Sequence, residues 1–97
     1  MKKRGRIQII GDMLRITENG ANKTKVMYKA NLSHNLLEKY LEVLLDKGLL
    51  IIADNVYYTT EKGREFIRHY QRIMCLLEES NNAYAYTKQT ALGIAPT

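Results

Sequence analysis

The side chains able to do chemistry in this 97-residue sequence are few and widely spaced. His34 and His69 are its two histidines, and no carboxylate cluster accompanies either one at the spacing of metal ligands. His69 and Cys75 are six positions apart on one expected helix, which places them on different faces. The sequence also contains no glycine-rich phosphate loop and no nucleophile elbow. These patterns predict a protein without enzymatic activity, cofactor, metal ion or small-molecule ligand.

Positive charge is concentrated in the amino-terminal third of the chain. Residues 1–29 carry eight basic and two acidic side chains, a net +6, whereas the remaining residues carry seven basic and eight acidic ones, a net −1. Such an asymmetry is typical of one face made for a polyanion. The alternative is that these lysines and arginines serve only solubility.

Polar groups suited to base edges follow this basic segment. Ser33, His34 and Asn35 can donate or accept hydrogen bonds, and Asn can pair with adenine. Lys39 can reach guanine or a phosphate. The cations expected to contact the sugar–phosphate backbone are Arg4, Arg6, Lys23, Lys25 and Lys29.

Two acidic residues oppose this interpretation of residues 33–39. Glu38 and Glu42 lie one helical turn apart on the same polar face, where they repel phosphate. Glu38 can instead accept a hydrogen bond from cytosine N4. The alternative is that the segment 34–47 is only a structural helix with a solvated acidic face.

Three helices precede any strand signal. Apolar residues at intervals of three and four predict helices over 6–17, 23–30 and 34–47, with a loop at 18–22 and a tight turn at 31–33. Asn22 and Ser33 are expected to cap the second and third helices, and Gly48 to end the third. The expected buried stripe of the third helix is Leu36, Leu37, Tyr40, Leu41, Leu44 and Leu45.

The hydrophobic period changes after residue 48. The segments LLIIA (49–53) and VYYTT (56–60) are rich in β-forming residues and flank Asp54-Asn55, which predicts a hairpin. A helical pattern capped by Thr60 then runs from 61 to about 80. The order α-α-α-β-β-α, with a tight turn between the second and third helices, predicts a mainly α winged helix-turn-helix.

The last predicted helix carries an apolar stripe that a small domain cannot cover along its whole length. Exposed, this stripe would favour self-association, and the alternative is that it folds back onto its own domain. The expected division is a DNA-binding head at 1–60, a dimerisation helix at 61–80 and a poorly ordered tail at 81–97. The expected dimer interface is Phe66, Ile67, Tyr70, Ile73, Met74 and Leu77.

A family resemblance rests on KTKVMYKANLSHNLLEKYLEVLLDKGLL, the hairpin, and the following YYTTEKGREF. Over roughly residues 5–80 the sequence resembles an archaeal group of winged-helix DNA-binding proteins. This group includes the crenarchaeal ten-kilodalton (10a-type) chromatin protein and related predicted transcriptional regulators. The resemblance implies a homodimer joined by an antiparallel coiled coil of the last helix, with double-stranded DNA as the partner. It also places Thr24 and Tyr28 on the DNA side.

The sequence therefore predicts a dimeric, non-enzymatic DNA-binding protein that acts as a transcriptional regulator or a nucleoid protein. The single Cys75 cannot form an internal disulfide, which fits the reducing cytoplasm. No apolar run approaches the length of a membrane span, so no membrane partner is expected. The alternative is a winged-helix module that binds another protein instead of DNA.

Overall fold

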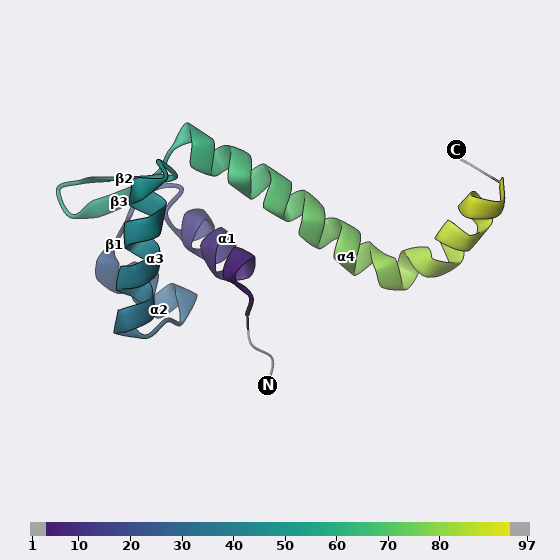
Figure 1. The fold of residues 1–97 in the computed structure, drawn as a ribbon, viewed down its shortest axis with the longest axis horizontal. Coiled ribbons are helices and arrows are strands. Elements are labelled where there is room, and N and C mark those ends of the chain that lie inside the picture. Colours follow the sequence, from purple (N-terminus) through teal and green to yellow (C-terminus); the bar gives the residue numbers. More distant parts are fainter. Residues whose placement is uncertain (1–3, 94–97) are drawn as a thin grey trace.

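The computed structural model describes the backbone of residues 4–93 and the side chains of residues 4–78. The elements follow in the order α1 (Arg6–Ile16), β1 (Ala21–Asn22), α2 (Lys23–Ala30), α3 (His34–Asp46), β2 (Leu50–Ala53), β3 (Val56–Thr59) and α4 (Glu61–Gly93). Elements α1 to β3 form a head from which α4 extends (Figure 1). The predicted order of helices and hairpin is confirmed. Within the described chain, no helix is both long and apolar enough to cross a membrane.

The strand β1 lies in the segment predicted to be a loop at 18–22. It pairs with β3 in the register Ala21↔Tyr57 and Asn22↔Val56, which gives a three-stranded antiparallel sheet in the order β1-β3-β2. Two residues are too few to show an alternating pattern, so this strand exists only because β3 offers it a pairing edge. The hairpin β2–β3, called the wing below, turns at Asp54 and Asn55, which both have positive φ.

The corner between α2 and α3 is fixed by its local sequence. Asn31 ends α2 in the left-handed conformation, with φ 55°, and the N–H of Leu32 donates to the carbonyl of Met27 at 3.1 Å. The Ser33 hydroxyl then accepts from the N–H of Leu36 at 3.2 Å and so begins α3. At the start of α2, the Asn22 side chain accepts from the N–H of Lys25 at 2.8 Å. Both predicted helix caps are confirmed.

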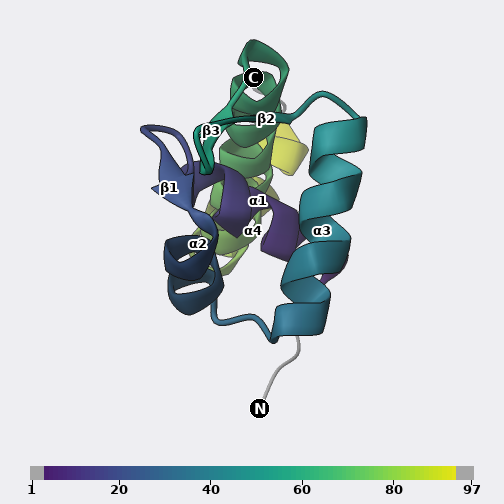
Figure 2. The same ribbon diagram turned by 90° about the vertical axis from the view of Figure 1, so that its left-hand side faces the viewer.

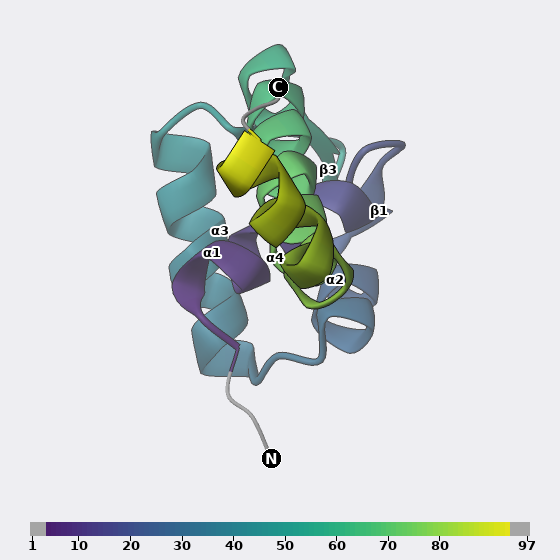
Figure 3. The same cartoon turned by 90° about the vertical axis from the view of Figure 1, so that its right-hand side faces the viewer.

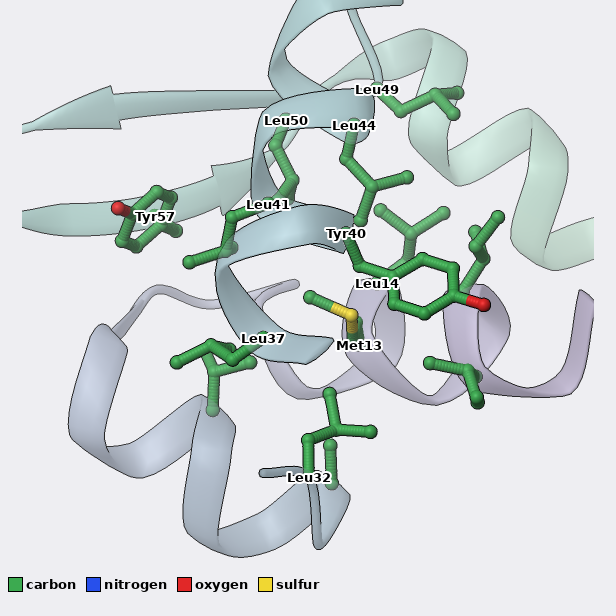
Figure 4. Close-up of a cluster of buried hydrophobic side chains, with 14 of the residues drawn as sticks. Met13, Leu14, Leu32, Leu37, Tyr40, Leu41, Leu44, Leu49, Leu50 and Tyr57 are labelled. Atoms are coloured by element: carbon green, nitrogen blue, oxygen red, sulfur yellow. The ribbon is translucent and has the colours of Figure 1, made fainter. Parts of the chain in front are cut away.

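Helix α3 packs its apolar stripe onto α1 (Figure 4). Its buried residues are Leu37, Tyr40, Leu41 and Leu44, and they meet Met13 and Leu14 of α1 in one core. Leu36, predicted to belong to this stripe, is 40% exposed. The repeat of three and four that starts at Leu37 leaves Leu36 on the flank of the helix. Leu45 lies at the edge of the core and is half-buried.

Helix α4 begins where predicted and continues further. The Thr60 hydroxyl accepts from the N–H of Gly63 at 3.0 Å and donates to the carbonyl of Gly48 at 2.6 Å. The helix runs to Gly93, past the predicted end near residue 80. The segment after residue 80 contains alanines and no proline before Pro96, so nothing in it breaks a helix. The predicted tail at 81–97 falls on residues whose side chains, and from 94 also the backbone, lie outside the described part.

Close packing fixes the start of α4 against α1. A Cβ on Gly11 would lie 2.6 Å from the Tyr70 ring, so the ring occupies space that only glycine leaves open. Ile67 and Tyr70 are buried here, and the Phe66 and Tyr70 rings stack with centroids 6.5 Å apart. From the side of its far end, α4 lies in front of α1 (Figure 3).

A buried pair of threonines joins α1 to the wing. The Thr59 hydroxyl donates to the carbonyl of Leu14 at 2.6 Å and lies 2.8 Å from the Thr17 hydroxyl. The N–H of Thr59 donates to the carbonyl of Thr17 at 3.0 Å. Both side chains are almost fully buried, so these hydrogen bonds determine where β3 crosses the end of α1.

Replacing Thr59 by valine keeps the shape of the side chain and removes its hydroxyl. We expect Thr59→Val to lower the free energy of unfolding by about 1–3 kcal/mol, because the buried hydrogen bonds of the Thr59 hydroxyl to the Leu14 carbonyl and the Thr17 hydroxyl are lost. The double variant Thr17→Val/Thr59→Val should lose less than the sum of the two single losses, because no buried hydroxyl then remains. Urea denaturation of the four proteins measures this coupling, and strictly additive losses would contradict it.

Candidate nucleic-acid interface

Helices α2 and α3 present their exposed faces at the end of the head opposite the far end of α4. Figure 2 looks onto this end, with α2 and α3 in front and α4 running away behind them. Because the leucine stripe of α3 is buried against α1, its polar residues face solvent. Ser33, His34, Asn35 and Lys39 are all exposed, as predicted for residues that reach base edges.

A cluster of three charged or chargeable side chains joins the start of α2 to the first turns of α3. The ammonium of Lys23 donates to Glu38 Oε2 at 2.7 Å. The same carboxylate oxygen lies 3.4 Å from His34 Nε2, one turn earlier on α3. The hydrogen bond from Lys23 lowers the pKa of Glu38, and the same bond raises the pKa of Lys23. Both groups are therefore charged at neutral pH, and each partly neutralises the other.

The remaining lysines of α2 face a different way. Lys25 and Lys29 line an open hollow of about 580 Å³ between α1 and α2. The other lining residues are Asp12, Arg15, Ile16 and Glu18. The three lysines predicted to act together are thus divided, with Lys23 directed to α3 and the other two to α1. Their spacing accounts for this division, because residues 23 and 25 are about 200° apart around a helix.

Thr24 and Tyr28 occupy the exposed surface of α2. Both are exposed, and Tyr28 is 84% accessible, which is unusual for an aromatic side chain. The phenol of Tyr28 can donate to a phosphate, and its ring can pack on a sugar. Their exposure is consistent with the DNA-facing place that the family resemblance gives them.

Arg4 forms its hydrogen bonds within the protein. Its guanidinium donates to the Asp12 carboxylate at 2.8 Å, to the Asn31 carbonyl at 3.2 Å and to the Ala30 carbonyl. These bonds tie the segment before α1 to the end of α2, where helix carbonyls lack helical partners. Arg4 was expected to contact the DNA backbone, and its geometry gives it a structural role at the α2–α3 corner. Arg6 is exposed on the first turn of α1.

The wing carries exposed apolar side chains and no cation. Ile51, Ile52 and Tyr58 are exposed, and Asp54 and Asn55 form the tip. The sequence predicted the turn at Asp54-Asn55 but not this apolar surface. The alternation of a strand indicates which residues share a face, but it does not show that this hairpin projects beyond the core.

Some of the predicted dimer residues are buried against the head, and others are exposed to solvent. Ile67 and Tyr70 are buried against the head of their own chain, and Phe66 is half-buried beside them. Ile73 and Leu77 are exposed, and Met74 is half-buried. Of the predicted interface, Ile67 and Tyr70 are thus covered by the head of their own chain, and Ile73 and Leu77 remain accessible to a partner.

Among residues 4–78, no group of three His, Cys, Asp or Glu side chains is placed to hold a metal ion. The exposed surface of α2 and α3 is instead a set of hydrogen-bond donors and acceptors with charges of both signs.

This arrangement of helices and wing has known relatives. A protein-family profile described as winged helix-turn-helix matches residues 3–78. The chain belongs to this family. In winged helix-turn-helix terms, α2, the corner and α3 form the helix-turn-helix, and β2–β3 is the wing.

Two uncharacterized proteins of Methanocaldococcus jannaschii are similar in sequence. One is 34% identical over 76 residues, which cover 77% of this chain and 36% of the relative. The other is 31% identical over 64 residues, which cover 65% of this chain and 66% of the relative. The chain thus spans about a third of the length of the first relative and about two thirds of the second.

A solved structure has the same fold along nearly the whole chain. It is that of Sso10a-2, a DNA-binding protein from Sulfolobus solfataricus, with a TM-score of 0.72 and 28% sequence identity. The match covers 97% of this chain and 100% of the other. Together with the family match, it confirms the predicted resemblance to the archaeal 10a-type winged-helix group.

The role of Arg4 can be tested by its removal. We expect Arg4→Gln to lower the free energy of unfolding by about 1 kcal/mol, because it removes charge-assisted hydrogen bonds to the α2–α3 corner. Arg6→Gln is the matched control, since Arg6 is exposed two residues away and a cation at a helix start is not stabilising. Thermal unfolding of both variants measures the difference, and equal stability would contradict a structural role for Arg4.

Proposed function

We propose that this chain binds double-stranded DNA through the exposed face of α2 and α3, and acts as a transcriptional regulator or a nucleoid protein. The observation that carries the proposal is the start of α3, where Ser33, His34 and Asn35 project into solvent from a helix whose other face is buried. The shared fold with a DNA-binding protein supports it. Such a protein would be nucleoid-associated in the cytoplasm.

The physical mode of binding follows from how a helix-turn-helix meets a duplex. The first residues of α3 enter the major groove, where Asn35 can pair with adenine and Lys39 can reach guanine or a phosphate. Lys25 and Lys29 lie beside Arg15 on the flank of α2, within reach of a phosphate backbone that passes the head. The acidic tip of the wing, Asp54, does not favour a phosphate, so the helices rather than the wing supply most contacts.

Self-association through α4 completes the proposal. Ile73 and Leu76 are 46% and 49% exposed on α4. A helix that leaves such side chains in water is stabilised by a partner, and a second copy of α4 in antiparallel orientation would cover them. The product would be a homodimer with two DNA-binding heads.

A protein-binding role is the second candidate function. The exposed Ile51, Ile52 and Tyr58 of the wing favour it, because an apolar surface without cations suits a protein better than a phosphate backbone. In this case, removal of the cations on α2 would leave the function intact.

DNA binding is expected to depend on salt through the cations of α2. Lys25→Ala/Lys29→Ala should reduce the slope of log affinity against log salt by about 1.8, since each lost phosphate contact contributes about 0.9. The measurement is a fluorescence titration with a random-sequence duplex between about 50 and 200 mM salt. Comparison with the protein's own promoter separates a regulator from a nucleoid protein, because equal affinities favour the nucleoid role.

The control is Arg68→Ala/Arg72→Ala, which removes two exposed cations one turn apart on α4. This control should leave the slope close to that of the wild type. No binding by the wild type at low salt, or binding without salt dependence, would reject the proposed function. An unchanged slope in the lysine variant would reject the proposed surface.

Dimerisation is tested by placing a charge on the exposed stripe of α4. Ile73→Glu is expected to give monomers, because an interface that buries this position would also bury the carboxylate. Gln71→Glu adds the same charge at an exposed position on the opposite side of α4 and should leave the mass unchanged. Sedimentation equilibrium measures the mass of each variant, and a dimeric Ile73→Glu protein would exclude this interface.

A further inference from the structure

One carboxylate stands in the middle of the surface proposed to meet DNA. Glu38 Oε2 is 2.7 Å from Lys23 Nζ and 3.4 Å from His34 Nε2, and all three side chains are solvent-accessible. The cluster joins the first residue of α2 to the first two turns of α3. The cation best placed to meet a phosphate next to the start of α3 is therefore already paired.

This pairing has a consequence for binding to the DNA backbone. A phosphate that takes Lys23 from Glu38 leaves the carboxylate without its partner and close to the negatively charged backbone. When Lys23 contacts only the DNA backbone, the freed Glu38 carboxylate repels the nearby phosphates and so weakens this contact. A duplex that supplies a hydrogen-bond donor to Glu38 relieves this opposition. In the major groove, the donor that pairs with a carboxylate is the N4 amino group of cytosine.

We infer that Glu38 is a specificity-determining residue, which withholds Lys23 from phosphate on most sequences and releases it where a cytosine N4 donates to its carboxylate. The inference rests on the proposed DNA binding through α2 and α3. The exchange keeps the number of hydrogen bonds: Glu38 changes its partner from the ammonium to the neutral amino group of cytosine, and Lys23 changes its partner from the carboxylate to a phosphate.

Glu42 provides a matched comparison on the same helix. It lies one turn after Glu38 on the polar face of α3 and is exposed. Among residues 4–78, Glu42 takes part in no ion pair. Removal of either charge changes the net charge of the protein equally. Only the removal of Glu38 releases Lys23.

The first test is affinity for a random-sequence duplex as a function of salt. Glu38→Gln should bind about tenfold more tightly than the wild type at low salt, with a slope steeper by about 0.9, because one more cation contacts a phosphate. Glu42→Gln should gain about twofold or less, with the slope unchanged, because it removes only a screened repulsion. Adding Lys23→Ala to Glu38→Gln should restore the wild-type slope. Circular dichroism verifies that each variant is folded.

The second test is selection of bound duplexes from a random pool. The wild type should enrich cytosine at one position, and Glu38→Gln should replace it by adenine there, because a glutamine amide pairs with adenine N6 and N7. The other selected positions and the selection by Glu42→Gln should be unchanged.

Three results would overturn the inference. If Glu38→Gln and Glu42→Gln had equal DNA affinity and equal salt slope, Glu38 would act only through its negative charge, as Glu42 does. A selected sequence that is the same with and without Glu38 would exclude base readout by this side chain. Failure of the wild type and all variants to bind any duplex at low salt would instead reject the proposed function itself, and the inference with it.

Discussion

The core shared by α1, α2 and α3 is the packing on which the rest of the structure depends. Met13, Leu14, Leu37 and Leu44 have almost no accessible surface, and they belong to one cluster of buried side chains (Figure 4). Burying side chains of this size contributes about 1.5–3 kcal/mol each before the cost of ordering the chain. Rotation of α3 about its axis would remove these contacts. The exposed position of its polar residues is therefore a consequence of the core.

Charge within the candidate interface is more balanced than the sequence suggests. The first 29 residues carry a net +6, but Arg4 is paired with Asp12, and Lys23 is paired with Glu38. Cations in such pairs attract a polyanion less than unpaired ones do, because a nearby carboxylate opposes their field. Arg4 also holds the corner between α2 and α3, so one basic residue serves the geometry of the surface rather than its charge. Affinity for DNA then depends on fewer cations than the composition indicates.

Much of the fold could be predicted because its signals are local. Asn22 and Ser33 cap helices through atoms of their own neighbourhood, and the leucine spacing of α3 identifies most of its buried face. Strand β1 could not be predicted, because it depends on pairing with a distant strand, in which Tyr57, the partner of Ala21, lies 36 residues later. The exposure of Leu36 could not be predicted either, since Leu36 and Leu45 lie on the two flanks of the stripe and only tertiary packing decides which flank is covered.

The candidate site was predictable as a set of residue types and not as a set of partners. The sequence identified Glu38 and Lys23 separately, but their ion pair joins residues 15 positions apart on two helices. The direction of a long side chain is determined by what surrounds it, and a lysine has enough freedom to face several neighbours. The spacing places Lys25 on another side of α2 than Lys23, but only the tertiary packing shows that α1 lies on that side.

The attachment of α4 to the head connects the proposed dimer to the proposed DNA contacts. Gly11 allows the Tyr70 ring to pack directly on α1, and Ile67 is buried one turn earlier, so α4 leaves the head at a fixed angle. Because α1 is also the helix that holds α3, the direction of α4 and the orientation of α3 are determined by the same core. A dimer built on α4 would therefore hold its two α3 helices at one separation. A fixed separation is what allows a dimer to contact two half-sites on one face of a duplex, whereas freely hinged heads would bind without regard to spacing.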